Sequence, residues 1–257
     1  MCHFASLNRS AYSEEVSGWS RWHQGEKGKW MEQNACDNPF HNEALAARYD
    51  RWYETPLGAV AHRCDKSLIQ RLARPQAGER TPDRATATGH FALDLAKHGL
   101  KVTGCDSSES MLQVARAKDA SLDWRRCQAA SLPLADGVFD LVLSVTVLEF
   151  VPDPPRAMAE MYRVAAPGGR VVVGVLNARS PWAAMYRRQQ EGPFRHAHFY
   201  TAKEFLELLG TYGPVGWNSA VFFGPSGCGR RIAPLLESLG QTFCKGRGAL
   251  LVGRIDK

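Results

Sequence analysis

Asp106 directly follows residues 100–105, which are interpreted as a buried strand. Before that stretch, the apolar residues within 91–96 have a spacing suited to a packed helix, and Gly99 is placed to end it. An acid roughly 20 residues after a strand-to-helix turn is the arrangement in which a carboxylate accepts hydrogen bonds from ribose hydroxyls. Residues 80–106 therefore predict a site for a ribose-containing ligand, with Asp106 as its acceptor.

The turn before that helix resembles the first motif of the class I S-adenosylmethionine-dependent methyltransferases, specifically their small-molecule (type 11, UbiE-like) branch. That motif reads acid-x-Gly-x-Gly-x-Gly, and the matching positions here are Asp83, Ala85, Ala87 and Gly89. The resemblance implies that the turn holds the amino-acid end of S-adenosylmethionine, since N–H groups at a helix N-terminus favour anionic groups. S-adenosylmethionine is thus the expected cofactor, and methyl transfer to O, N or C of a small-molecule acceptor is the expected reaction.

Two glycines of that motif are alanines in this chain, and Pro82 lies in the preceding strand. Glycine permits positive φ and close approach of a ligand, so Ala85 and Ala87 are each expected to cost about 1 kcal/mol or more. Three explanations of residues 81–87 stay open. They are a compensated pair of frameshifts in the gene or its sequence record, divergence to a catalytically impaired binding protein, and a working site that tolerates alanine.

The resemblance also implies cofactor contacts outside the turn. It places residues 49–58 over the cofactor, Met111 beside the adenine, and Gln128 where an aspartate usually accepts a hydrogen bond from the adenine amino group. A glutamine oxygen can accept the same bond without charge. Tyr49 and Met111 are equally compatible with ordinary packing. The implied cofactor-binding residues are Tyr49, Asp83, Ala85, Ala87, Gly89, Asp106, Ser107, Met111, Gln128 and Ala129.

Three residues are candidates for catalysis. Glu149 follows the fourth expected strand, where the resemblance implies contact with cofactor and substrate; a structural hydrogen bond is its alternative role. Residues 177–200, which the resemblance implies form a lid over the acceptor, contain His196 and His198. Either histidine could take a proton from an acceptor hydroxyl, because histidine titrates near neutrality; the alternative is a solvated surface loop. Their spacing suits two metal ligands on a strand, but no third ligand is evident, so no metal is expected.

The order of the expected elements indicates an α/β fold. The resemblance implies a Rossmann-like, doubly wound, mostly parallel seven-stranded sheet with helices on both faces and an antiparallel pair at one edge. Residues 1–37 are expected to be a disordered leader, with Met31 a possible true start, and residues 38–257 the methyltransferase domain. The expected helices are 42–53, 60–72, 107–118, 156–164, 201–210 and 232–239, and the expected strands after residue 106 are 122–127, 139–147, 170–176, 215–223 and 249–255, with a turn at 166–169.

Composition favours a globular protein of the cytoplasm. The 257 residues are 44% hydrophobic and 23% charged, and no apolar run reaches the roughly 20 residues of a membrane span, so no integral membrane association is expected. The seven cysteines are scattered without zinc spacing, which favours reduced thiols. The net charge of +6 is dispersed in sequence, which favours a solvated surface over a nucleic-acid site, and the partner that the resemblance implies is a small-molecule acceptor. A nucleic-acid methyltransferase and a hydride-transfer enzyme are the less favoured alternatives, and the oligomeric state stays open.

Overall fold

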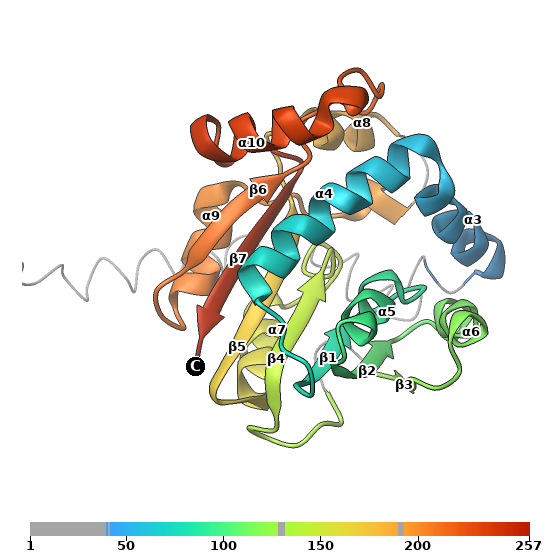
Figure 1. Cartoon of the computed structure of the whole chain (residues 1–257), viewed down its shortest axis with the longest axis vertical. Helices are drawn as coiled ribbons and strands as arrows, with labels where there is room; N and C mark the ends of the chain where they lie inside the picture. Colours follow the sequence, from blue (N-terminus) through green and yellow to red (C-terminus); the bar gives the residue numbers. More distant parts are fainter. Residues whose placement is uncertain (1–39, 41, 128–131, 190–192) are drawn as a thin grey trace, which may run out of the picture. The chain divides into compact units, whose positions relative to one another are not determined.

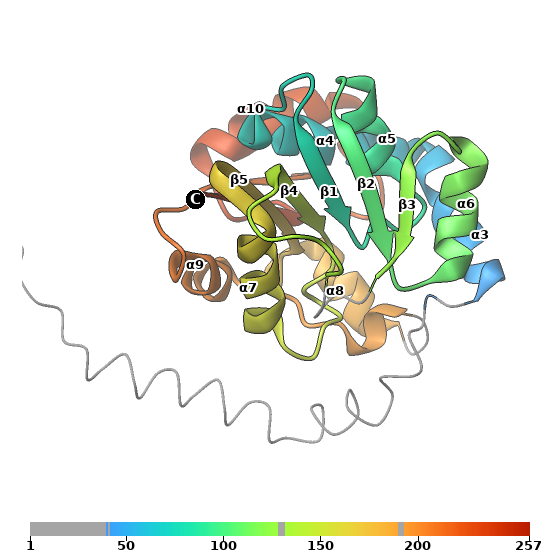
Figure 2. The same cartoon turned by 90° about the horizontal axis from the view of Figure 1, so that it is seen from below.

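The computed structural model describes residues 40, 42–127, 132–189 and 193–257; the predicted leader at 1–37 lies outside the described residues. Its seven strands form one sheet in the order β3-β2-β1-β4-β5-β7-β6 (Figures 1 and 2). The neighbours from β3 to β5 are parallel, whereas β7 pairs antiparallel with both β5 and β6. This arrangement confirms the predicted fold class. The strands are β1 (Arg80–Arg84), β2 (Lys101–Asp106), β3 (Asp123–Arg126), β4 (Phe139–Val145), β5 (Ala165–Leu176), β6 (Gly216–Ala220) and β7 (Leu250–Asp256).

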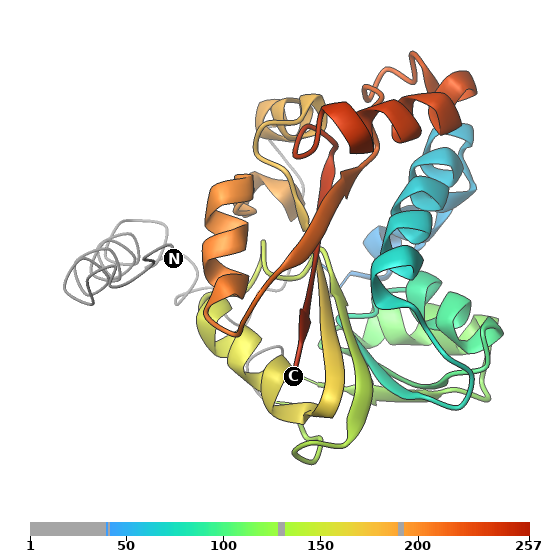
Figure 3. The same cartoon turned by 60° about the vertical axis from the view of Figure 1, so that its left-hand side comes forward.

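Helices cover both faces of this sheet, and a separate apolar core fills each side. One core contains apolar residues of α4, α5, α6 and α10, and the other contains those of α7 and α9. Figure 3 shows the sheet between these two layers. No described helix is long and apolar enough to cross a membrane. The helices are α3 (Glu43–Glu54), α4 (Pro56–Ala73), α5 (His90–Lys97), α6 (Glu109–Lys118), α7 (Pro154–Val164), α8 (Pro181–Arg188), η1 (Pro193–His196), α9 (Ala202–Gly210), η2 (Arg230–Ile232) and α10 (Ala233–Phe243).

Local signals fix several helix ends. Thr201 and Glu204 form the predicted capping box at the start of α9. Gly99, with φ of 81°, follows the end of α5 in the left-handed conformation that glycine adopts readily. The helix expected at 60–72 begins earlier, at Pro56, because Thr55 caps the Gly58 amide and proline suits the first helical position.

A turn was predicted at residues 166–169, before a strand at 170–176, and this predicted start of the strand was wrong. Strand β5 already begins at Ala165, which pairs with Phe139, and the register then shifts before Leu141 pairs with Arg170. The Pro-Gly-Gly stretch is therefore an irregularity within a longer strand. Such an irregularity places extra residues on β5 opposite β4 without ending the strand.

Candidate cofactor and active site

The carboxyl ends of β1 and β2 meet at one edge of the sheet and bring Asp106 to the turn at residues 85–89. The parallel register pairs Arg84 with Cys105, so Asp106 lies beside the turn. One carboxylate oxygen of Asp106 accepts a hydrogen bond from the Ala87 N–H at 2.8 Å, and the other accepts one from the Ser108 N–H at 2.8 Å. The predicted acceptor and the predicted turn are thus directly joined.

Ala85 and Ala87 both adopt the left-handed conformation, with φ of 51° and 48°. This confirms that the backbone at both positions is the kind that glycine favours. Alanine is strained there because its Cβ crowds the following carbonyl. The turn is thus formed with its glycine-type geometry despite the two methyl groups.

We expect Ala85→Gly with Ala87→Gly to stabilise the folded chain by about 1 kcal/mol, because relief of two strained positions exceeds the added flexibility of the unfolded chain. Chemical denaturation followed by circular dichroism measures this difference. Ala92→Gly within α5 is the matched control and should destabilise instead, since Ala92 is a buried helical residue. An equal loss of stability in both variants would contradict the strain argument.

Gly89 ends the turn and is required by packing as well as by backbone conformation. Its φ is 83°, and a Cβ built there would lie 2.7 Å from Cη2 of Trp124. Gly89 is also the N-cap of α5 and provides no side-chain hydrogen bond to that helix. The first amides of α5 are therefore left to other acceptors.

Asp83 stabilises the turn from within. It is 2% exposed and accepts a hydrogen bond from the Thr86 hydroxyl at 2.7 Å. Burial raises the pKa of Asp83 to about 7; the Thr86 bond opposes this rise, and the nearby Asp106 charge adds to it. Asp83 therefore shapes the turn, whereas Asp106 is the carboxylate at the strand end.

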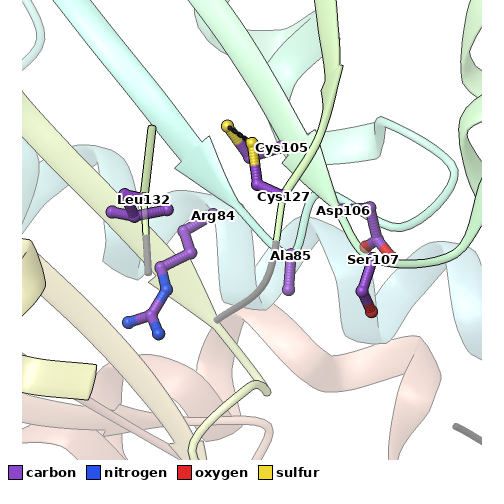
Figure 4. Close-up of a pocket in the computed structure, with 7 residues that line it drawn as sticks. All are labelled: Arg84, Ala85, Cys105, Asp106, Ser107, Cys127 and Leu132. Atoms are coloured by element: carbon purple, nitrogen blue, oxygen red, sulfur yellow. Dashed lines mark hydrogen bonds between the residues drawn. The ribbon is translucent and has the colours of Figure 1, made fainter. Parts of the chain in front are cut away.

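Arg84 is a buried charge that sequence reasoning missed. It lines a small cavity with Ala85, Cys105, Asp106, Ser107, Cys127 and Leu132. Figure 4 shows its guanidinium pointing away from Asp106 and Ser107. One terminal nitrogen donates to the Ala157 carbonyl at 2.9 Å, while Nε and the other terminal nitrogen have no partner in the described part of the chain. Burial lowers the Arg84 pKa to about 10. The one sequence signal for Arg84 is its position directly after Asp83, within residues 81–87 where the chain departs from the glycine motif.

Helix α3 covers the polar edge formed by the two aspartates. The Tyr49 and Tyr53 hydroxyls lie 2.8 Å apart. Burial, together with the charges of Asp106 and Asp83, raises the pKa of Tyr49 to about 12, and the hydrogen bond with Tyr53 opposes this rise. The Phe40 carbonyl, just before α3, accepts a hydrogen bond from the Ser108 hydroxyl at 2.6 Å. The predicted place of Tyr49 over this edge is thus supported by its surroundings, and its contact with cofactor stays a prediction.

A second polar cluster, also missed, joins α3 to α5 and α6. The Asp50 carboxylate lies 2.8 Å from Nε2 of His90 and pairs with Lys118, which also donates to the Thr88 carbonyl at 2.8 Å. The His90 ring stacks on Tyr53 with centroids 3.8 Å apart. Burial and the Lys118 charge lower the pKa of His90. These contacts fix the covering helix to the turn.

The remaining predicted cofactor residues fall into two groups. Ser107 lines the small cavity beside Asp106, and Met111 is 1% exposed on α6, outside the residues that line that cavity. Gln128 and Ala129 lie outside the described residues. The binding roles of all four stay predictions.

The three catalytic candidates are not equivalent. Glu149 is fully buried; one carboxylate oxygen accepts the Leu176 N–H at 2.5 Å, and the other has no partner from another described residue. Its backbone carbonyl accepts the His198 N–H at 2.9 Å. The His198 ring is partly exposed and lies edge-on to Tyr200 at 4.5 Å. His196 ends η1. The contact of Glu149 is the structural hydrogen bond considered as its alternative.

Aromatic rings connect the beginning of the described chain to the segment predicted as a lid. Phe40 lies edge-on to Tyr49 at 6.4 Å and to Phe150 at 5.3 Å. Phe150 contacts Phe194 at 5.7 Å, and Phe194 stacks on Tyr186 at 4.3 Å. Tyr186 and Phe194 are therefore connected to Tyr49 of α3 through Phe150 and Phe40, and the role of this segment as a lid stays a prediction.

Known proteins share this sequence pattern. Residues 83–173 match the family described as methyltransferase domain. A demethylmenaquinone methyltransferase of Beutenbergia cavernae is 36% identical over 169 residues, which cover 65% of this chain and 61% of the relative. A malonyl-[acyl-carrier protein] O-methyltransferase of Serratia marcescens is 35% identical over 147 residues, covering 57% of this chain and 58% of the relative. The chain spans about three fifths of the length of these curated relatives.

The fold has a counterpart among solved structures. A Thermotoga maritima protein, described as a SAM-dependent methyltransferase and possible histamine N-methyltransferase, superposes with a TM-score of 0.66 at 25% identity. The match covers 84% of this chain and 97% of that protein. The similarity therefore extends well beyond the segment that contains Asp83 and Asp106.

Proposed function

We propose that this chain is a class I S-adenosylmethionine-dependent methyltransferase, which binds S-adenosylmethionine and transfers its methyl group to a small-molecule acceptor; the matches to methyltransferases in sequence and in fold support this. The observation that carries the proposal is the hydrogen bond between Asp106, at the end of β2, and the Ala87 amide in the turn after β1. It joins a carboxylate suited to ribose hydroxyls with a helix start suited to an amino-acid carboxylate.

The residues present fit this cofactor. Gly89 has no side chain to cap the first amides of α5. The Asp83 carboxylate accepts the Ala92 amide, and amides at a helix N-terminus favour an anionic group. A carboxylate such as that of Asp106 can accept about four hydrogen bonds, which suits an acceptor of ribose hydroxyls. Ala85 and Ala87 each carry a methyl group that the glycines of the motif lack, at positions where φ is positive.

S-adenosylmethionine supplies an electrophilic methyl group on a sulfonium. The chain's own residues position the partners: Asp106 orients the ribose, Asp83 and Thr86 hold the turn, and Tyr49 helps to exclude water. Catalysis comes mainly from this alignment. Because the acceptor and the methyl group are already held in line, the chemical step does not require the entropy loss of bringing them together in solution. If the acceptor is protonated, His198 is the better of the two described side chains to receive its proton, because the Glu149 carboxyl is fully buried.

Calorimetric titration of the purified chain with S-adenosylmethionine and with its demethylated product tests binding. We expect dissociation constants in the micromolar range, about 10 μM. No heat from a folded chain would contradict the proposal. Transfer is then tested with methyl-labelled cofactor and two acceptor classes suggested by the names of the relatives, a demethylmenaquinone and a malonyl thioester.

A catalytically impaired binding protein is the second candidate, and the positive φ of Ala85 and Ala87 favours it. In that case cofactor binding would be weak or absent, and Ala85→Gly with Ala87→Gly would strengthen it at least tenfold, the ratio that corresponds to about 1.4 kcal/mol. Equal cofactor affinity of the parent chain and the double variant would exclude impairment by these two methyl groups.

A further inference from the structure

Helix α10 and the residue before it carry all four large apolar side chains that are exposed in the described part of the chain. Leu235 is 56% exposed, Leu239 48% and Phe243 78%, and Ile232 just before the helix is 53% exposed. Their spacing of three, four and four residues places them along one side of a helix. We call these four residues the apolar stripe. Figure 1 shows α10 as an outlying helix beside α4.

The opposite side of α10 is firmly attached to the domain. Gly240 packs so closely on the Phe222 ring that a Cβ there would lie 2.3 Å from it. The Glu237 carboxylate accepts hydrogen bonds from the Val221 and Phe222 amides at 3.1 and 2.8 Å. The helix cannot roll to bury the stripe without breaking these contacts, so the stripe faces outward in the folded domain.

Basic side chains lie in the groove between α10 and α4 and next to both ends of this helix. A groove of about 1090 Å³ separates α10 from α4, and four arginines line it: Arg63, Arg71, Arg230 and Arg231. Beyond the end of α10, Lys245 and Arg247 are exposed. Residues 229–248 contain four basic residues and a single acid, Glu237, whose carboxylate is occupied by backbone amides. An apolar stripe is therefore flanked by positive charge at both ends.

We propose that α10 is a docking surface for an anionic lipid bilayer. The stripe would enter the boundary between headgroups and acyl chains, and the arginines of the groove would bind lipid phosphates, as amphipathic helices with basic flanks do. A second copy of the chain fits less well. Whether two stripes packed parallel or antiparallel, each basic end of one helix would face a basic end of the other. Binding of α10 to a bilayer is a separate property from the proposed methyl transfer and does not depend on it.

Vesicle flotation of the full chain tests this surface. The vesicles are phosphatidylcholine alone, or phosphatidylcholine with about one third phosphatidylglycerol. Arg230→Gln with Arg231→Gln removes charge, and Leu235→Gln with Phe243→Gln removes apolar contact. The matched controls are Lys97→Gln with Lys203→Gln, exposed cations on α5 and α9, and Leu235→Met with Leu239→Met, which keeps the stripe apolar. Circular dichroism confirms that each variant is folded.

The expected result is binding to the anionic vesicles that weakens with salt, about 30-fold weaker in the arginine variant and at least about tenfold weaker in the glutamine variant of the stripe. Both controls should bind like the parent chain. Failure of the folded parent chain to bind anionic vesicles would overturn the proposal, and so would binding unaffected by either test variant. Concentration-dependent dimerisation that Leu235→Gln with Phe243→Gln abolishes, together with absent vesicle binding, would assign the stripe to a second copy and also overturn it.

Discussion

Replacing Asp106 with alanine is expected to lower the affinity for S-adenosylmethionine by about 100-fold, the ratio typical of losing hydrogen bonds to a charged group. Two effects add. The ribose loses its acceptor, and the amides of Ala87 and Ser108 lose the carboxylate that holds the turn in place. Calorimetric titration against the parent chain measures the loss, with ligand raised to millimolar concentrations for the variant.

Two further variants sharpen that test. Asp106→Asn keeps one side-chain oxygen as an acceptor, so its loss should be intermediate, about tenfold. Asp123→Ala removes an exposed aspartate near the start of β3 and should leave the affinity unchanged. If Asp106→Ala bound as tightly as the control variant, Asp106 would not be the ribose acceptor.

Raising the pH from about 5 to about 8.5 is expected to lower the free energy of unfolding by about 4 kcal/mol through Glu149 alone. Burial raises the pKa of Glu149 to about 8 from an ordinary value of 4.5. The folded state therefore binds a proton that the unfolded state releases, so this stability is fully present below about pH 4.5 and is lost as the pH rises through 8. Urea denaturation across the pH range measures the slope. Asp83, with a pKa of about 7, adds to it in the same direction.

Glu149→Gln removes the share of Glu149 from this pH dependence, because glutamine does not titrate. Its oxygen can still accept the Leu176 N–H, so the fold should be kept. Glu204→Gln is the matched control, since glutamine also serves in a capping box. The control should retain the slope of the parent chain. A slope in Glu149→Gln as steep as that of the parent chain would show that the Glu149 carboxyl titrates normally.

Most elements could be predicted because their signals are local. A capping threonine, a glycine after a helix and an unbroken apolar run act within a few residues, and they placed α9, the end of α5 and β4. The turn at Ala85 and Ala87 was predicted for the same reason, through its resemblance to a glycine motif. The start of α4 was predicted too late, because the apolar pattern does not show the cap that Thr55 provides. The length of β5 was predicted too short, because that pattern does not show the shifted pairing that begins at Ala165.

Several features of the site could not be predicted, because they join residues distant in sequence. The burial of Arg84 follows from its place under the sheet edge, next to α7. The contact of Asp50 with His90 and Lys118 exists because α3 packs near α5 and α6. No periodicity or spacing in the chain marks those residues as partners.

The sequence by itself determined the order of the strands and helices, the acid at the end of β2 and the residues available for the turn, since each depends on neighbours along the chain. Only the tertiary structure decided which charges are buried, which pKa values shift, and which side of α10 faces outward. Those outcomes depend on desolvation and on contacts across the sheet. Gly240 against Phe222 turns the apolar stripe outward, and an apolar pattern alone would have assigned it to the core.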